Sequence, residues 1–174
     1  REQKQFDLFL CPRLPYLFVY PISEYPSMRK KNTAPITVPI EKVELEDHSY
    51  HILVAVEING IAGDMIIDTG ASVTVADRQL FPCFEEPEEA VKIQSGSITG
   101  EIKDVQVMHT ESFQIGSIQL QEMCIALIDL DYVNTMYKKH LNRKVIGLLG
   151  SDFCIRHGII IDYPHLTLTI SRQD

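Results

Sequence analysis

The sequence lacks the features that would support several common functions. Its four cysteines are scattered and form neither a CxxC pair nor the spacing of a zinc site. The only Lys/Arg cluster is Arg29-Lys30-Lys31, and a formal net charge of -8 with a pI near 5.2 would repel nucleic acid phosphates. No apolar run approaches the ~20 residues that a transmembrane helix needs. We therefore expect no nucleic acid partner and no membrane span.

Patterns for metal binding or for a serine or cysteine nucleophile are also missing. No Gly-x-Ser-x-Gly motif and no Cys/His arrangement is present. His48 and His51, with Asp47 nearby, come closest to a metal site, but no Cys or further His stands at ligand spacing. Asp129 and Asp131 are better explained as residues at a helix start. The expectation is a protein without a metal or other cofactor.

The chain divides into an arm and one globular domain. At 174 residues and 45% hydrophobic composition it suits a single domain with a proper core. Residues 1–40 form a Pro-rich extended arm, because six prolines at short intervals exclude a long helix, and residues 41–174 form the domain. The chain begins at Arg1 rather than Met, so we expect an upstream segment to have been removed. That favours an exported or cell-envelope protein and leaves the compartment itself open.

From residue 50 onward the pattern favours β structure. "HILVAVEINGIAGDMIID" holds two apolar runs around Asn59-Gly60, a dipeptide typical of tight hairpin turns. A similar unit follows in "DVQVMHTESFQIGSIQLQEMCIALIDL", around Gly116. The tail "GIIIDYPHLTLTI" predicts a strand, a turn and a final alternating strand. The expected fold class is all-β, mainly strands with short helices.

Three short helices are predicted between the strands. Asp77 would cap one over "DRQLF", and Ser151 would cap another over "SDFCIRH", closed by Gly158. Residues 131–142 place apolar side chains at helical spacing, which indicates an amphipathic helix.

The stretch "MIIDTGAS" raises a chemical question. It runs an apolar strand directly into Asp68 and follows this acid with a small hydroxyl residue, a glycine and an alanine. A carboxylate at the end of a buried strand is costly unless it is hydrogen-bonded or performs chemistry. This makes Asp68 the first candidate for a functional residue.

Two ordered signatures carry a family resemblance. "DTGAS" behind two isoleucines, followed by "GLLGSDFCIRHGIIIDYPHLTLTI", resembles the retropepsin-like aspartic proteases of the single-domain cellular and bacterial type, over residues 43–170. The resemblance implies a closed β-barrel, the half of an acid protease, and hydrolysis of protein or peptide substrates. It also implies a catalytic role for Asp68, Thr69 and Gly70, with the Thr69 hydroxyl reaching the opposite loop.

The chain holds only one Asp-Thr-Gly, so the resemblance implies a homodimer with one Asp68 from each subunit. Two close carboxylates share one proton, so that one serves as acid and the other as base. Asp152 is the internal candidate for a second acid, although a place in the first turn of a helix explains it better. The alternative function is a non-catalytic or latent protein that uses the fold for peptide binding or dimerisation.

The resemblance also assigns residues around the acid. Ala71 stands where family members working at low pH carry Ser, so we expect activity at mildly acidic to near-neutral pH. The segment "VKIQSGSITGEIKDV" fits a flexible flap that excludes water from the cleavage step. The residues expected to contact substrate are Ala71 and, in the flap, Gly96, Ser97, Ile98, Thr99 and Gly100. Terminal strands form much of the dimer interface in the family, which makes the arm and residues 166–170 the expected contacts.

Overall fold

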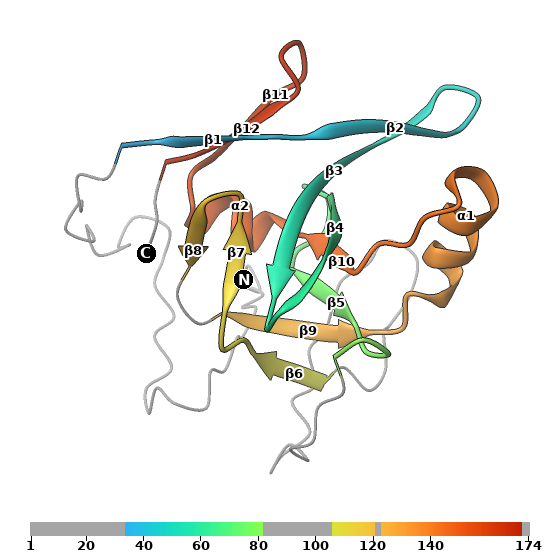
Figure 1. The fold of residues 1–174 in the computed structure, drawn as a ribbon, viewed down its shortest axis with the longest axis horizontal. Coiled ribbons are helices and arrows are strands. Elements are labelled where there is room, and N and C mark those ends of the chain that lie inside the picture. The colour runs from blue at the N-terminus through green and yellow to red at the C-terminus, as the bar shows by residue number, and fades with distance from the viewer. Residues whose placement is uncertain (1–33, 82–105, 121–122, 172–174) are drawn as a thin grey trace, which may run out of the picture.

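The computed structural model describes residues 34–81, 106–120 and 123–171, and within these ranges the fold is mainly β (Figure 1). This confirms the expected fold class. The strands are β1 (Ile36–Pro39), β2 (Glu41–Glu46), β3 (Ser49–Ile58), β4 (Ile61–Ile67), β5 (Val75–Asp77), β6 (Gln106–His109), β7 (Phe113–Ile115), β8 (Ile118–Leu120), β9 (Cys124–Ile128), β10 (Gly147–Leu149), β11 (Ile159–Asp162) and β12 (Thr167–Ile170). The helices are α1 (Asp131–Leu141) and α2 (Ser151–Arg156). The predicted flap residues lie outside the described ranges, as do residues 1–33 of the arm.

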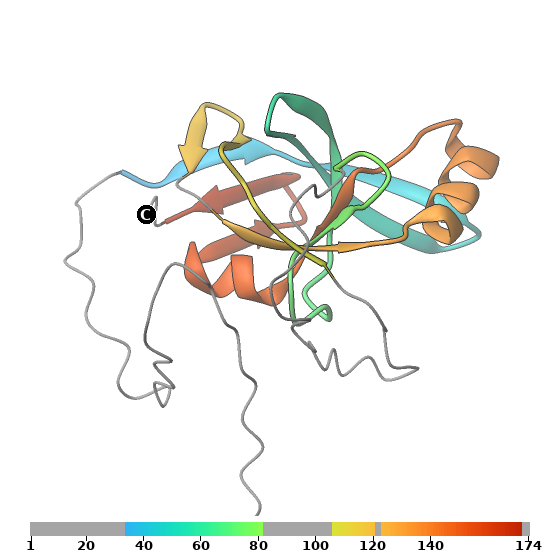
Figure 2. The same ribbon diagram turned by 90° about the horizontal axis from the view of Figure 1, so that it is seen from below.

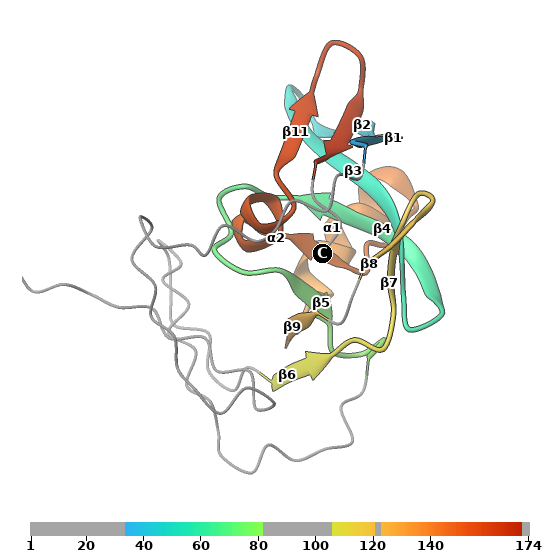
Figure 3. The same cartoon turned by 90° about the vertical axis from the view of Figure 1, so that its left-hand side faces the viewer.

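The larger sheet runs in the order β6-β9-β5-β10-β4-β3-β7-β8, with β2 also paired to β3. It curls around the core (Figure 3). The predicted hairpin at Asn59-Gly60 is confirmed, with β3 and β4 antiparallel on either side. Both turn residues have positive φ, 49° for Asn59 and 80° for Gly60, as a two-residue hairpin turn requires. Most pairs in the sheet are antiparallel, but β10 runs parallel to β4, and β5 runs parallel to β9.

A second, three-stranded sheet has the order β1-β12-β11. Its β1 strand comes from the last residues of the expected arm and ends at Pro39, on a sheet edge where proline is tolerated. The predicted tail is confirmed as the hairpin β11–β12, which projects from the body of the molecule in Figure 1.

One hydrophobic core lies inside the curled sheet. The alternation of β3 sends Ile52, Val54 and Val56 into this core, where they meet Met65 of β4 and Phe153 of α2. All of these side chains are buried. The core therefore joins the larger sheet to the helix that follows β10.

A second cluster lies on the opposite face of the same strands, beneath α1. Leu53 of β3 and Ile66 of β4 point away from the first core, and they pack with Tyr137 and Val145. Tyr137 is fully buried, and its hydroxyl lies 2.8 Å from Nδ1 of His51. The helix predicted over residues 131–142 is confirmed, and it buries strand residues that would otherwise face water.

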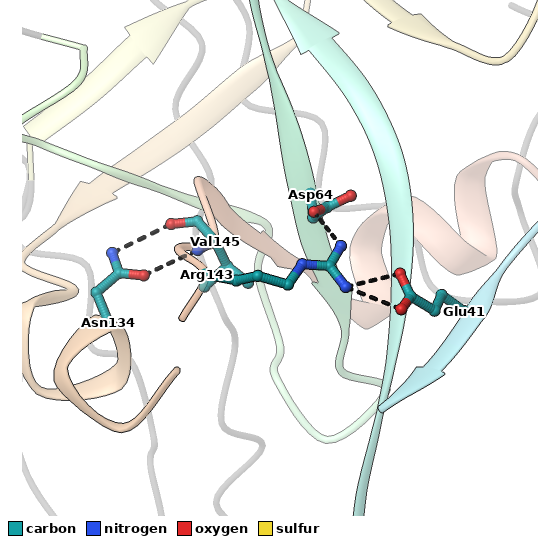
Figure 4. Close-up of polar contacts among 5 residues, drawn as sticks. All are labelled: Glu41, Asp64, Asn134, Arg143 and Val145. Carbon is teal, nitrogen blue, oxygen red and sulfur yellow. Dashed lines mark hydrogen bonds and ion pairs between the residues drawn. The ribbon is translucent and has the colours of Figure 1, made fainter. Parts of the chain in front are cut away.

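Side chains of α1 and of the segment that follows it tie the helix to the sheet (Figure 4). Buried Asn134 donates to the Val145 carbonyl at 3.1 Å and accepts from the Val145 N–H at 2.8 Å, and it also donates to Asp77. Arg143 donates to Glu41 of β2 at 2.8 Å and to Asp64 of β4 at 2.6 Å. These hydrogen bonds raise the pKa of Arg143 above its usual value. The contacts fix the approach of the chain from α1 into β10.

The helix predicted at Asp77 is wrong. Asp77 ends β5, and residues 78–80 form a turn instead. The Asp77 carboxylate does accept the Gln79 N–H at 3.1 Å, as a helix cap would, but its other oxygen accepts from Asn134. A side chain of this kind can stabilise a turn as well as a helix start, so the local signal did not distinguish the two.

None of the helices in the described ranges is long and apolar enough to cross a membrane.

Burial raises the pKa of Tyr137 to about 12, with a further upward contribution from Asp64 and an opposing one from Arg143. Between pH 10 and 12 the unfolded chain ionises this tyrosine while the folded chain keeps it protonated, so the free energy of unfolding falls as pH rises. Tyr137→Phe should flatten this decline. At pH 7 it should lower the free energy of unfolding by about 1 kcal/mol, because the hydrogen bond to His51 is lost.

Urea denaturation at a series of pH values measures both effects. Tyr132→Phe is the matched control, since Tyr132 lies on the same helix with 79% of its surface exposed. The interpretation of Tyr137 is wrong if Tyr137→Phe and Tyr132→Phe show the same alkaline dependence as the parent chain.

Candidate active site

Two parallel strands carry Asp68 to the surface. The chain leaves the sheet at Asp68, directly after β4, and β10 lies alongside with Leu149 paired to Ile67. The Asp68 N–H donates to the Leu149 carbonyl at 2.9 Å, so the strand pairing extends one residue into the loop. The acid therefore stands at the carboxyl ends of two neighbouring strands, and the backbone of both fixes its position.

Asp68 is half-buried, and its carboxylate is hydrogen-bonded within its own loop. The Gly70 N–H donates to Oδ1 at 3.0 Å, and the Ala71 N–H donates to the Asp68 carbonyl at 3.1 Å. A Cβ at Gly70 would lie 3.3 Å from the same Oδ1, closer than most such contacts, so glycine eases the approach of the backbone. The amide donor offsets part of the cost of placing a carboxylate beside a buried strand.

Thr74 is the last residue of the Asp68 loop, which runs from residue 68 to residue 74 between β4 and β5. Only 1% of the surface of Thr74 is exposed. Its hydroxyl accepts the Gly150 N–H at 3.1 Å and donates to Oδ1 of Asp152 at 2.8 Å. The Ser151 N–H donates to the Ala71 carbonyl at 2.8 Å. These bonds connect the Asp68 loop to the residues where β10 ends and α2 begins.

Gly150 is required at that junction because the chain passes very close to the Asp68 loop. A Cβ at Gly150 would lie 2.5 Å from the Val73 carbonyl carbon and 2.8 Å from Asp152. Any larger residue would push the two segments apart. The two signatures of the sequence, "DTGAS" and "LLGSDF", are therefore halves of one structure.

Asp152 lies in the first turn of α2, where the sequence predicted it, and its carboxylate is engaged by Thr74. Ser151 is the first helical residue, and Gly150 occupies the cap position assigned to Ser151 from the sequence. The contact with Thr74 gives Asp152 a structural role, because it helps to hold the loop together.

The remaining predicted site residues fall into two groups. Thr69 is exposed and Ala71 is half-buried, both in the Asp68 loop. The flap residues, Gly96 to Gly100, lie outside the described ranges.

Two of the residues considered for metal binding have side chains engaged in other contacts. His51 meets Tyr137, and Oδ1 of Asp129 accepts the Asp131 N–H at 2.8 Å, which confirms Asp129 at a helix start. Within the described ranges, no three His, Cys, Asp or Glu side chains are grouped so that they could hold a metal ion.

Sequence reasoning missed Thr74. A signal was available, because Thr74 is a polar residue directly before the apolar Val75 and Ala76 of a short buried strand. A buried hydroxyl needs partners, and the loop of the second signature supplies them. The pairing could not be read from the chain alone, since the two segments are 76 residues apart.

Comparisons with known proteins found two similar solved structures and one family model. A solved retropepsin-like aspartic protease from Rickettsia conorii is 18% identical, with a TM-score of 0.46 over 79% of this chain and 90% of that one. The retroviral protease-like domain of Ddi1 from Leishmania major is 16% identical, with a TM-score of 0.45 over 68% of this chain and 86% of that one. Among curated protein sequences, no match was found.

The family model described as "Aspartyl protease" matches residues 54–153. The matched segment begins in β3, includes the whole Asp68 loop and ends in α2. It therefore spans both of the signatures that meet around Thr74. Because the model covers more than half of the sequence, the chain belongs to the aspartyl protease family.

Proposed function

We propose that this protein is an aspartic endopeptidase whose active site forms between two copies of the chain. The observation that carries the proposal is the placement of Asp68, at the ends of two parallel strands, in a loop held by Gly70 and Thr74. The loop leaves the acid partly open to solvent, where a substrate can reach it. Family membership adds support for a hydrolase.

The proposed chemistry uses a pair of Asp68 carboxylates. Like charges at hydrogen-bonding distance do not both ionise, so the pair holds one shared proton and titrates as a unit. One carboxylate takes a proton from the attacking water, while the protonated one polarises the scissile carbonyl and then supplies a proton to the leaving nitrogen. This mechanism needs no metal and no cofactor.

A second copy is proposed because one chain supplies a single Asp-Thr-Gly. In a two-fold dimer the two loops face each other, and Thr69, which is exposed in the single chain, would be covered by the opposite loop. The substrate is proposed to be an extended protein or peptide segment between the loops. Residues Gly96 to Gly100 are retained as the proposed flap over it.

Asp68→Asn should lower the hydrolysis of an unstructured protein substrate by about a thousandfold or more, because an amide cannot share the proton. The change hardly alters volume, so the free energy of unfolding should stay within about 1 kcal/mol of the parent value. Asp47→Asn, at the exposed turn between β2 and β3, is the matched control and should leave hydrolysis unchanged.

Cleavage assays at equal concentrations of folded protein decide the question. Undiminished activity in Asp68→Asn would remove the aspartic protease proposal. No activity in the parent chain at any protein concentration would favour the alternative, a non-catalytic protein that binds peptides or dimerises through this fold.

Thr74→Val removes the hydroxyl while keeping the shape of the side chain. It leaves the Gly150 N–H and Asp152 without this partner, so the free energy of unfolding should fall by about 1–3 kcal/mol. The value of kcat per folded molecule should fall as well, because the Asp68 loop loses one of its connections to the residues that follow β10. Thr74→Ser should restore both quantities.

Thr37→Val is the control, since Thr37 is exposed, its hydroxyl contacts that of Thr169 at 3.0 Å, and its loss should change stability by less than about 0.5 kcal/mol. Thermal melts and steady-state kinetics well below the melting temperature separate the two effects of Thr74→Val. A normal kcat in a destabilised variant would show that Thr74 supports the fold alone.

A further inference from the structure

The pairing of β6 with β9 brings a cysteine and a histidine together. His109 of β6 lies directly opposite Cys124 of β9, and Nδ1 of His109 lies 3.5 Å from the Cys124 sulfur. The sequence showed no Cys/His arrangement because the two residues are 15 positions apart, and the strand pairing supplies one. A cysteine within reach of a histidine base is a common arrangement for a nucleophilic thiol.

Core packing places both side chains on one face of the sheet. Met108 and Ile125, which neighbour the pair along the two strands, are buried in the hydrophobic core. Side chains alternate between the two faces along a strand, so His109 and Cys124 point away from this core. A slip of one residue would bury both polar side chains, which makes the register costly to change.

Hydrogen bonds next to the pair hold the two strands in this register. The N–H of buried Thr110 donates to the Met123 carbonyl at 2.8 Å, and the Thr110 hydroxyl accepts the Met123 N–H at 2.9 Å. These bonds continue the strand pairing by one residue beyond His109 and Cys124. The backbone is therefore anchored on both sides of the sulfur and the imidazole.

The pair can be reached from solvent. Cys124 is exposed and is not part of a disulfide, and His109 is half-buried. Their strands lie at one end of the larger sheet, where β6 is the last strand. This strand lies at the lower margin of the molecule in Figure 1 and faces the viewer in Figure 2. A small molecule can therefore approach the sulfur without opening the fold.

Cys154 of α2 offers a comparison within the same chain. It is half-buried, and burial together with the charge of Asp152 raises the pKa of its thiol. The thiolate is the reactive form of cysteine, so these surroundings make Cys154 a poor nucleophile at neutral pH. Cys124 is more exposed and has a base within hydrogen-bonding distance. The two thiols should therefore differ in reactivity.

We propose that Cys124 and His109 form a thiol-modification site that exchanges with low-molecular-weight disulfides. Nδ1 of His109 takes the proton of the Cys124 thiol, and the thiolate attacks one sulfur of the disulfide. A bond forms between these two sulfurs, the original disulfide bond breaks, and the departing thiolate takes the proton from His109. The Cys124 sulfur is oxidised and the released sulfur is reduced, so the exchange needs no other oxidant.

The modified residue would lie on the strand that borders the end of the Asp68 loop. The Ala126 N–H of β9 donates to the carbonyl of Thr74, the last residue of that loop, at 3.2 Å. Cys124 precedes Ala126 by two residues on the same strand. The site thus allows a small thiol to be attached reversibly beside the loop. It does not depend on the proposed function, because the exchange uses only the two side chains.

Reaction of the full chain with oxidised glutathione tests the proposal, with the adduct at each cysteine followed over time by peptide mass spectrometry. At pH 7, His109→Gln should slow adduct formation at Cys124 by about three- to tenfold, because the thiol loses its base. At about pH 9.5 the two chains should react at similar rates, because an ordinary thiol, with a pKa of about 8.5, is then ionised without help. His140→Gln, exposed on α1, is the matched control and should change neither rate.

Thermal melts check that each variant is folded, and dithiothreitol should release the adduct from Cys124. Equal rates for the parent chain and His109→Gln at pH 7 would overturn the proposal. Equal slowing at both pH values would also overturn it, since the histidine would then only keep the thiol accessible. Faster reaction at Cys154 than at Cys124 in the parent chain would contradict the assigned site.

Discussion

The parallel pairing of β4 with β10 is the constraint on which the proposed site depends. It brings together two segments that are far apart in the sequence, and the bond from the Asp68 N–H to the Leu149 carbonyl extends it to the acid. Thr74 adds a buried hydroxyl that joins the loop to the turn after β10. Gly150 has no side chain, and a Cβ there would clash with Val73, so glycine allows the two segments to approach closely enough for these contacts. The position of the carboxylate therefore follows from backbone geometry.

The strands around the site are held at both ends. Thr74 connects β5 with the end of β10 near Asp68, while Asn134 connects Asp77 at the far end of β5 with Val145, just before β10. The helix that carries Asn134 also covers an apolar face of the larger sheet. This gives α1 a physical role that the sequence left open. It supports the strands from the side away from the acid, and contacts with substrate are not needed to explain it.

Local signals were sufficient for much of the fold. Asn59-Gly60 located a hairpin because both residues accept positive φ, and the spacing of apolar residues located α1. The signal at Asp77 failed because a carboxylate that bonds a nearby N–H stabilises a turn or a helix, and the contact with Asn134 is long-range. Thr74 and the sheet order around β12 were missed for the same reason. Pairing between distant segments decides them, and a single sequence does not display it.

The central claim is that one active site is built from two chains, and mixing tests it most directly. Parent chain and Asp68→Asn chain can be unfolded together and refolded at a constant total concentration, so that mixed dimers form at random. If both carboxylates are needed, activity follows the square of the parent fraction and falls to about one quarter in an equal mixture. A linear decline, with about one half of the activity remaining, would show that each chain works alone and would contradict the account.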